Sequence, residues 1–416
     1  MTFSIYTLGC KVNSYESEFM THLFISRGYK KVEYEENADI YVINTCTVTN
    51  TSDNKSKKII NHTRKNNPNS IIVVCGCYAQ YKKGNIDNID NVDIILGNKD
   101  KSKIVDIVEE YIKEHKKIKN VYDLSKQDFE DMEIDKFESH TRAFVKIQDG
   151  CNNFCSYCII PFVRGNVRSK KMELVIDEVK KLVKSGHKEI VLTGIHTGNY
   201  GRELGYTLTS LLKQLKCIDG LKRIRISSIE ITELTDEFLE ELNTNKLIVD
   251  HMHIPLQSGN DKILKLMNRK YDTKYFEKKI NKIRSIRPDI SITTDVIVGF
   301  PHESDDDFSK TYKFIEKIKF TKLHVFPYSP RIGTKAATMD EQVDGKIKKQ
   351  RVRKLIDLSN KLEQEYYNKF IDKDLDVLIE RKVNNEYIGH TSNYLEAKIK
   401  SNEDLTNKII KIKIGS

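Results

Sequence analysis

The stretch Gly150-Cys-Asn-Asn-Phe-Cys-Ser-Tyr-Cys158 places three cysteines within eight residues, directly after a strand-like run at 143–148. In (β/α) barrels the active site lies where strands hand over to loops at their carboxyl ends. Three close thiolates can bind three irons of a 4Fe–4S cluster, which leaves the fourth iron without a protein ligand. A catalytic metal centre needs such an open position. Cys151, Cys155 and Cys158 are therefore the predicted ligands of a catalytic cluster.

A zinc knuckle is the alternative interpretation of these cysteines. It needs a fourth ligand at a suitable spacing, and His140 lies before the strand rather than beside the motif. The spacing C-x-x-x-C-x-x-C also resembles the signature of the radical S-adenosylmethionine (SAM) superfamily. That resemblance implies that SAM binds the open iron. One electron from the cluster then cleaves SAM to methionine and a 5′-deoxyadenosyl radical.

Strand-like runs alternate with helical patterns, such as 172–185 and 273–286, on the C-terminal side of Arg142. Six strand–helix units indicate a partial TIM-type (β/α)6 barrel. The expected strands are 143–148, 189–193, 223–229, 251–255, 291–298 and 322–327.

Several short segments at the predicted strand ends are candidates for holding the adenosyl part of SAM. The glycines among them allow a close approach of backbone to ligand, although each is also compatible with an ordinary turn. The candidate contacts are Gly194, Ser228, Gln257 and Gly299.

The N-terminal part predicts a second α/β unit. Apolar runs at 3–9, 39–44, 70–75 and 92–96 are strand-like, and helical patterns occupy 14–28 and 101–115. Strands that alternate with helices pair in parallel, so we expect a doubly wound parallel α/β domain.

One cysteine follows each of the first three strands of this unit: Cys10, Cys46 and Cys77. The carboxyl edge of an open α/β sheet is where such domains bind ligands, so three thiols there suggest a second cluster with one free iron. Cys75 lies two residues before Cys77 and should face the same side of the strand. Because Cys75 lies inside the apolar run, we assign Cys77 as the ligand and Cys75 as a core residue, with Cys75 as the alternative. Cys217 is interpreted as a core residue.

Long ordered motifs across the chain resemble the methylthiotransferases, a family of radical SAM enzymes with two clusters. The motifs are Thr7-Leu-Gly-Cys-Lys-Val-Asn13, Asn44-Thr-Cys-Thr-Val48, Gly76-Cys-Tyr-Ala-Gln80, the central cysteine motif through Pro161, Arg164-Gly165, Arg168-Ser169 and His253-Ile-Pro-Leu-Gln-Ser-Gly259. The first of these, with His324-Val-Phe-Pro-Tyr-Ser329, most resembles the MtaB subfamily.

The resemblance implies that the chain converts N6-threonylcarbamoyladenosine at position 37 of tRNA to its 2-methylthio derivative. It implies that one SAM methylates a sulfur species at the N-terminal cluster, and that a radical from a second SAM removes hydrogen from C2 of the adenine. An electron donor such as flavodoxin or ferredoxin is expected. The threonylcarbamoyl carboxylate calls for cationic partners, and Arg164, Arg168 and Arg331 are candidates near the barrel mouth.

The last part of the chain has short alternating runs that predict a small antiparallel β-barrel. Residues 371–416 resemble a short TRAM domain, an RNA-binding barrel, through Gly389-His-Thr-Ser-Asn-Tyr394. The Lys-rich run 408–414 could contact phosphates without reading sequence, or could guard a solvated edge strand. The basic run 346–354 could add phosphate contacts or form a plain charged helix face.

The expected domains are an N-terminal α/β domain at 1–120, a polar linker at 121–140, the radical SAM barrel at 141–369 and the TRAM-like domain at 370–416. The formal charge of +10 fits either a Lys-rich solvated surface or a polyanionic partner such as RNA. No apolar run approaches membrane-spanning length, and the strand-like start lacks a basic n-region, so a cytoplasmic location is expected.

Three other functions compete with this interpretation. A relative that modifies a ribosomal protein is disfavoured by the basic tail, and a relative that acts on isopentenyladenosine in tRNA is not excluded by charge. A non-catalytic iron–sulfur RNA-binding regulator would have no need of barrel-mouth motifs such as residues 255–258.

Overall fold

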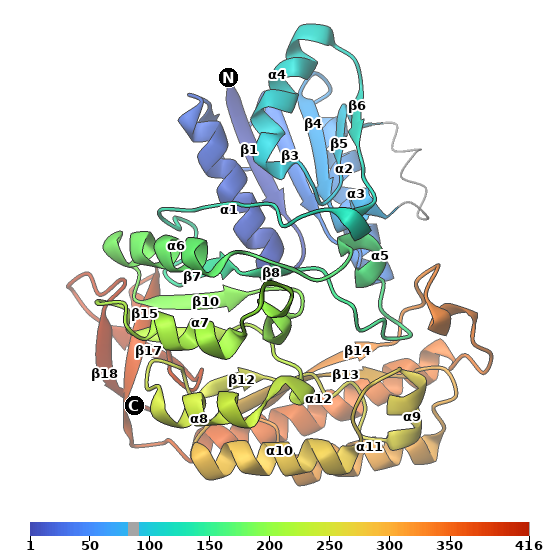
Figure 1. Ribbon diagram of the computed structural model, residues 1–416, viewed down its shortest axis with the longest axis vertical. Coiled ribbons are helices and arrows are strands. Elements are labelled where there is room, and N and C mark those ends of the chain that lie inside the picture. The colour runs from blue at the N-terminus through green and yellow to red at the C-terminus, as the bar shows by residue number, and fades with distance from the viewer. Residues whose placement is uncertain (82–90, 416) are drawn as a thin grey trace.

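The N-terminal domain is a parallel sheet with helices on both faces, in a computed structural model that describes residues 1–81 and 91–415 (Figure 1). Its sheet has the strand order β2-β1-β3-β4-β5-β6, and its buried apolar strands explain the parallel pairing. The elements are β1 (Thr2–Thr7), α1 (Lys11–Ser26), β2 (Lys30–Lys31), β3 (Ile40–Thr45), α2 (Asn50–Asn66), β4 (Ile71–Gly76), α3 (Cys77–Gln80), β5 (Ile94–Leu96), α4 (Ile104–Glu114) and β6 (Ile118–Asn120).

Helices α1 and α4 pack on one face of this sheet through Phe24 and Ile104, whereas α2 packs on the other through Ile60. The doubly wound arrangement is thus confirmed. The chain leaves β1 towards β2 on one side and then returns to place β3 on the other. The carboxyl ends of β1 and β3 therefore form the topological switch point, where such sheets bind ligands.

The central region confirms the six predicted barrel strands. Strands β7, β10 and β11 form one parallel sheet, strands β12, β13 and β14 form another, and a parallel bridge between Ile224 and Ile248 joins them. The elements are β7 (Ala143–Lys146), β8 (Gln148–Asp149), α5 (Ile160–Arg164), β9 (Arg168–Ser169), α6 (Met172–Lys184), β10 (Glu189–Thr193), α7 (Leu208–Leu215), β11 (Arg223–Ile226), α8 (Asp236–Thr244), β12 (His251–His253), α9 (Asp261–Leu266), α10 (Thr273–Ile286), β13 (Ser291–Val298), α11 (Asp305–Ile318), β14 (Lys322–Pro327) and α12 (Gly345–Asn368).

The C-terminal strands β15 (Asp374–Val383), β16 (Glu386–Thr391), β17 (Glu396–Lys400) and β18 (Ile409–Lys413) form an antiparallel sheet in the order β17-β16-β15-β18. A register shift between Ile379 and Arg381 bends the central pair, as bulges do, which gives the sheet its half-barrel form. Arg223 of β11 donates to the carbonyl oxygens of His390 and Asp376, so this sheet lies against the barrel.

The segment predicted as a polar linker carries apolar side chains that enter the barrel core. Met132, Ile134 and Phe137 are 3%, 0% and 2% exposed and pack in the same cluster as the barrel strands. Tyr15 of α1 joins them: its hydroxyl oxygen lies 2.7 Å from the Met132 carbonyl oxygen and 2.7 Å from Oε1 of Glu178 in α6. The N-terminal domain is thereby packed directly against the barrel. No helix in the described residues has the length and apolar content to cross a membrane.

Candidate functional site

The central cysteine loop begins at a turn that only glycine accommodates. Gly150 has a φ of +74°, and a Cβ there would lie 1.9 Å from the carbonyl oxygen of Asn166. The Cys151 amide donates to the Gly165 carbonyl oxygen at 3.0 Å. On the far side of the loop, Asn268 donates to the carbonyl oxygen of Phe154 at 3.0 Å. Hydrogen bonds therefore hold the loop at its start and at its middle.

Two cationic or polar side chains approach the thiols of this loop. Arg269 donates to Sγ of Cys155 at 3.3 Å and also pairs with Glu230. Nδ1 of His196 lies 3.7 Å from Sγ of Cys151, and its other nitrogen contacts Glu233. Each donor is thus oriented by a carboxylate. Neither residue was among the sequence predictions; only the position of His196 just beyond a predicted strand end was a signal for it.

The N-terminal cysteines meet at the switch point between β1 and β3. Gly9, with a φ of +113°, brings the turn after β1 so close that a Cβ would lie 3.0 Å from Cβ of Cys46. Asn13 ties the two strand ends together, since its amide donates to the carbonyl oxygens of Leu8 at 2.8 Å and Thr45 at 3.0 Å. The structure thus brings Cys10 and Cys46 to the predicted edge, with Cys77 beside them at the end of β4.

The prediction that Cys75 and Cys77 share a face is wrong. Strand β4 ends at Gly76, whose φ of +94° turns the chain directly into α3 at Cys77. Cys75 therefore packs with the α1 side of the sheet and Cys77 with the opposite side. Burial raises the pKa of the Cys75 thiol to about 12. The two thiols are thus separated by the sheet, and only Cys77 lies on the side of the barrel residue Val163.

The thiols of each cysteine trio influence one another's pKa. Burial raises the pKa of the Cys46 thiol to about 11, and the nearby Cys77 and Cys10 add to this rise. In the central loop, burial and the neighbouring Cys155 and Cys151 raise the pKa of Cys158 to about 12. Each trio is thus close enough to interact electrostatically. The described part of the chain contains no group of three or more Cys, His, Asp or Glu side chains already arranged to hold a metal ion.

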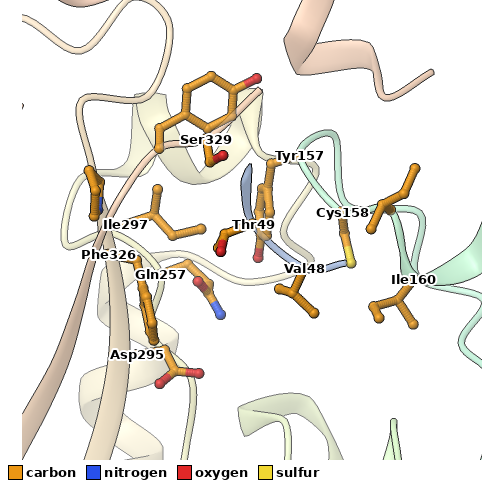
Figure 2. Close-up of a pocket in the computed structure, with 13 residues that line it drawn as sticks. Val48, Thr49, Tyr157, Cys158, Ile160, Gln257, Asp295, Ile297, Phe326 and Ser329 are labelled. Atoms are coloured by element: carbon orange, nitrogen blue, oxygen red, sulfur yellow. The ribbon is translucent and has the colours of Figure 1, made fainter. Parts of the chain in front are cut away.

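A cavity of about 210 Å³ lies between the central cysteine loop and the segment that follows Cys46 (Figure 2). The barrel contributes Cys158, Gln257 and Asp295 to its wall, and the N-terminal domain contributes Val48 and Thr49, which follow Cys46 by two and three residues. Ile160, Ile297 and Phe326 make the remaining surface largely apolar. Of the six cysteines predicted as cluster ligands, Cys158 is the one that lines this cavity.

Of the four predicted SAM contacts, the structure places one in this cavity. Gln257 lines it, with an unusual φ of +67° that is held by backbone hydrogen bonds to Asp295 and Ile297. Gly194 packs against Gln148, and the space beside Gly299 is filled by Lys348 of α12. Ser228 is half-buried just beyond β11. Of the four residues, Gln257 is therefore the one that lines this cavity.

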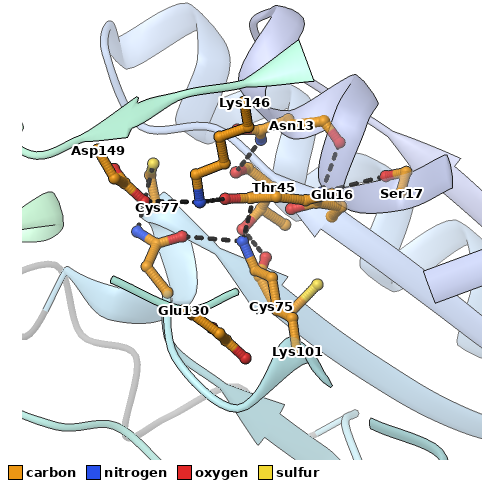
Figure 3. A network of polar contacts seen from close by, with 12 residues as sticks. Asn13, Glu16, Ser17, Thr45, Cys75, Cys77, Lys101, Glu130, Lys146 and Asp149 are labelled. Atoms are coloured by element: carbon orange, nitrogen blue, oxygen red, sulfur yellow. Dashed lines mark hydrogen bonds and ion pairs between the residues drawn. The ribbon is translucent and has the colours of Figure 1, made fainter. Parts of the chain in front are cut away.

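A buried ion network connects the N-terminal domain with the barrel (Figure 3). The Glu16 carboxylate of α1 pairs with Lys101, with Lys146 at 2.8 Å and with Arg164 at 2.8 Å. All four side chains are at most 3% exposed. Burial alone would raise the pKa of Glu16, but the three cations outweigh it and hold that pKa well below its usual range. Asp149 joins from the barrel through Lys146 at 2.7 Å.

Arg164 extends this network to a candidate cluster ligand. Its Nε donates to Sγ of Cys77 at 3.3 Å, and its Nη2 donates to Asn13 at 2.8 Å. Arg168 packs beside it and donates to the Arg164 carbonyl oxygen at 2.8 Å. Arg331 pairs with Asp53 at 2.8 Å and donates to Thr47 at 2.6 Å. All three arginines that we expected to meet a substrate carboxylate are therefore buried with protein partners.

Comparisons with known proteins agree with this architecture. Residues 145–315 match the radical SAM superfamily, and residues 2–97 match a family described as uncharacterized protein family UPF0004. Among solved structures, the radical SAM methyltransferase TsrM from Kitasatospora setae has a TM-score of 0.58 at 13% identity, covering 81% of this chain and 75% of that one. The likeness to TsrM is one of fold alone.

Curated relatives match over almost the whole chain. Threonylcarbamoyladenosine tRNA methylthiotransferase MtaB from Bacillus subtilis is 45% identical, covering 99% of this chain and 93% of its own length. The protein of that name from Aquifex aeolicus is 40% identical, with 98% of each chain covered. tRNA-2-methylthio-N(6)-dimethylallyladenosine synthase from Carboxydothermus hydrogenoformans is 35% identical, with 99% of this chain and 96% of that one covered.

We predict that Glu16→Gln lowers the free energy of unfolding by about 3–5 kcal/mol at pH 7, because it leaves buried cations without a counter-charge. The pKa of Glu16 is depressed in the folded chain, so its ionised form contributes stability above the unfolded value of about 4.3. This contribution is lost as pH falls below that value. Urea unfolding at pH 7 and at lower pH measures the difference, which should shrink on acidification. Glu110→Gln, exposed on α4, is the control. Equal effects of both substitutions would contradict the assigned role of the network.

Proposed function

The chain belongs to the methylthiotransferases of the radical SAM superfamily, and we propose that its substrate is tRNA carrying N6-threonylcarbamoyladenosine at position 37. It is an enzyme of the class that transfers a methylthio group with SAM and 4Fe–4S clusters. The observation that carries the proposal is the cavity that is lined both by Cys158 of the central loop and by Val48 and Thr49, which follow Cys46 in the N-terminal domain. A reaction that uses both clusters requires one position at which the substrate adenine is within reach of each cluster.

We assign Cys151, Cys155 and Cys158 to the catalytic cluster and Cys10, Cys46 and Cys77 to the second cluster. When bound, the first supplies the electron that cleaves SAM and the second supplies the sulfur. The donors at the thiols support this assignment: Arg269 points at Cys155 and Arg164 at Cys77, each within 3.3 Å. Charge-assisted hydrogen bonds of this kind stabilise thiolates. The apolar cavity wall, which includes Ile297 and Phe326, excludes water from the reacting groups.

The choice of modified adenosine rests on the relatives. Relatives named for threonylcarbamoyladenosine are 45% and 40% identical to this chain, whereas the relative named for dimethylallyladenosine is 35% identical. The dimethylallyl substrate is the second candidate because its synthases also match the full chain.

The C-terminal sheet is the proposed RNA-binding surface. Its edge strand β18 carries the exposed lysines Lys411 and Lys413, and basic surfaces bind phosphates by releasing counterions.

The proposal further includes Gly194, Ser228, Gln257 and Gly299 as SAM contacts, of which Gln257 is best supported because it lines the shared cavity. It also includes a small electron-transfer protein such as flavodoxin or ferredoxin as reductant, and a cytoplasmic location.

Two clusters should give about eight irons per chain after anaerobic reconstitution. Changing Cys151, Cys155 and Cys158 together to alanine should remove about half of this iron and abolish 5′-deoxyadenosine formation. Iron analysis and chromatography of the nucleoside measure the two effects. The interpretation of Cys217 as a core residue is wrong, because its side chain is exposed. It lies outside both trios, so Cys217→Ala should change neither. Full iron content in the triple variant would exclude the central loop as a cluster site.

The second cluster should depend on Cys77 and not on Cys75, because the turn at Gly76 places their thiols on opposite faces of the sheet. We expect Cys77→Ala to lose about half of the iron and all methylthio product, whereas Cys75→Ala keeps both. Nucleoside mass spectrometry of the product provides the measurement. The reverse pattern would identify Cys75 as the ligand.

The substrate can be tested by offering the reconstituted enzyme two tRNAs under anaerobic, reducing conditions. One carries threonylcarbamoyladenosine and the other isopentenyladenosine. We expect only the first to gain a methylthio group in nucleoside mass spectrometry. A product from the isopentenyl tRNA alone would replace the proposed substrate and leave the cluster chemistry intact.

A further inference from the structure

An exposed apolar patch lies beside the central cysteine loop. Phe154 of the loop and Phe162 of α5 are 50% and 56% exposed, and the centres of their rings lie 6.1 Å apart. Ile332, in the segment between β14 and α12, is 65% exposed and lines a small cavity together with Phe162. Single exposed apolar side chains are ordinary, but large ones that gather from separate parts of the chain indicate a surface that another molecule covers.

A cavity of about 410 Å³ connects this patch with a predicted cluster ligand. Phe154, Phe162 and Lys335 line the cavity, and so does Cys155. Among the described residues, none lines both this cavity and the shared cavity, which Cys158 lines. The central cysteine loop therefore has two separate faces, with Cys158 at the shared cavity and Cys155 at the exposed patch.

Lysines surround the patch on the side of α9. A groove of about 870 Å³ runs along this helix, which lies beside the segment between β14 and α12 (Figure 1). Phe154 and Lys335 line the groove, together with Lys262 and Lys265 of α9. Lys262 pairs with Asp307 at 2.8 Å. The apolar patch and the lysines thus belong to one continuous surface.

This groove presents an excess of positive charge to solvent. Lys265 and Lys335 are both exposed, and neither forms an ion pair with another described residue. Among the described residues that line the groove, Glu341 is the acidic one, and it pairs with His302 at 2.7 Å. The charges of the two lysines are therefore open to an acidic partner.

Hydrogen bonds hold both lysine-bearing segments against the cysteine loop. The Ala336 amide donates to the carbonyl oxygen of Ser156 at 2.7 Å. The Ser156 hydroxyl in turn donates to the carbonyl oxygen of Leu266 at 2.8 Å. Each of the two lysines is therefore one residue away from a direct contact with the loop, so their positions relative to the loop are fixed.

We propose that a small acidic protein that carries one electron binds the docking face, which consists of Phe154, Phe162, Ile332, Lys265 and Lys335. An apolar centre with a polar rim is the usual anatomy of a protein interface, and complementary charge selects the partner and speeds its encounter. One electron leaves the reduced carrier and enters the catalytic cluster, and no bond is made or broken. This inference rests on the proposed function, because it states where the reductant of that cluster binds.

The position of Cys155 favours an electron carrier over RNA, although exposed lysines attract both. Electrons pass between proteins only over short distances, and the docking face brings a partner to the cavity that Cys155 lines. The substrate adenine has to reach the shared cavity instead, where Cys158 lies. Carrier and tRNA therefore use different faces of the same loop. Encounters between electron-transfer proteins are weak and bury little surface, as suits a patch of this size.

The test titrates anaerobically reconstituted enzyme with a bacterial flavodoxin that contains its flavin, and calorimetry gives the dissociation constant. The double variant Lys265→Glu, Lys335→Glu should bind at least about tenfold more weakly than wild type, because each reversal replaces an attraction by a repulsion. Added salt should weaken wild-type binding by screening. The matched control Lys113→Glu, Lys278→Glu changes the net charge equally at exposed sites on α4 and α10 and should bind like wild type.

Two electron sources separate docking from catalysis. With reduced flavodoxin below its dissociation constant, the Lys265→Glu, Lys335→Glu enzyme should form 5′-deoxyadenosine at least about tenfold more slowly than wild type, in step with its weaker binding. With dithionite, a small reductant that needs no docking face, it should match wild type. The dithionite reaction thus shows that the variant is folded and carries its cluster.

Each other outcome overturns a different statement. Equal flavodoxin binding by the two double variants, or none by wild type, overturns the docking face. Weaker binding of tRNA with unchanged binding of flavodoxin assigns the face to RNA. A wild-type dimer in sedimentation that the Lys265→Glu, Lys335→Glu variant lacks assigns it to a second copy of the chain. If flavodoxin binds and drives 5′-deoxyadenosine formation but tRNA never gains a methylthio group, the proposed function fails while the docking face stands.

Discussion

The buried pairing of Glu16 with Lys101, Lys146 and Arg164 is the interaction on which the rest of the structure depends. It joins a helix of the N-terminal domain to a strand and a loop helix of the barrel, with no exposed charge among the four. Ion pairs this deeply buried are costly to break singly, so they fix how the two domains meet. Because Arg164 also contacts Cys77, the same contact sets the position of one cysteine site relative to the other.

The sequence was sufficient for the architecture because strand patterns and cysteine spacing are local signals. All six barrel strands and the four predicted N-terminal strands exist near their expected positions. The short edge strands β2 and β6 carry little apolar pattern and were not predicted. The sequence did not predict that residues 132–137 pack in the interior, because acidic residues surround the apolar ones. The burial of isolated apolar side chains depends on their tertiary partners and not on periodicity.

The site was less predictable than the fold. The face of Cys75 depended on where β4 ends, and a positive φ at Gly76 decides that. Arginines near motifs suggested substrate contacts, yet three of them are engaged by partners up to 284 residues away in sequence. Such pairings are invisible without coordinates.

The unequal exposure of the N-terminal cysteines has a consequence for their reactivity. Cys77 is buried and accepts a hydrogen bond from Arg164, whereas Cys10 is exposed to solvent. A reagent dissolved in water therefore contacts the Cys10 thiol directly, but reaches Cys77 only after the side chains that cover it move.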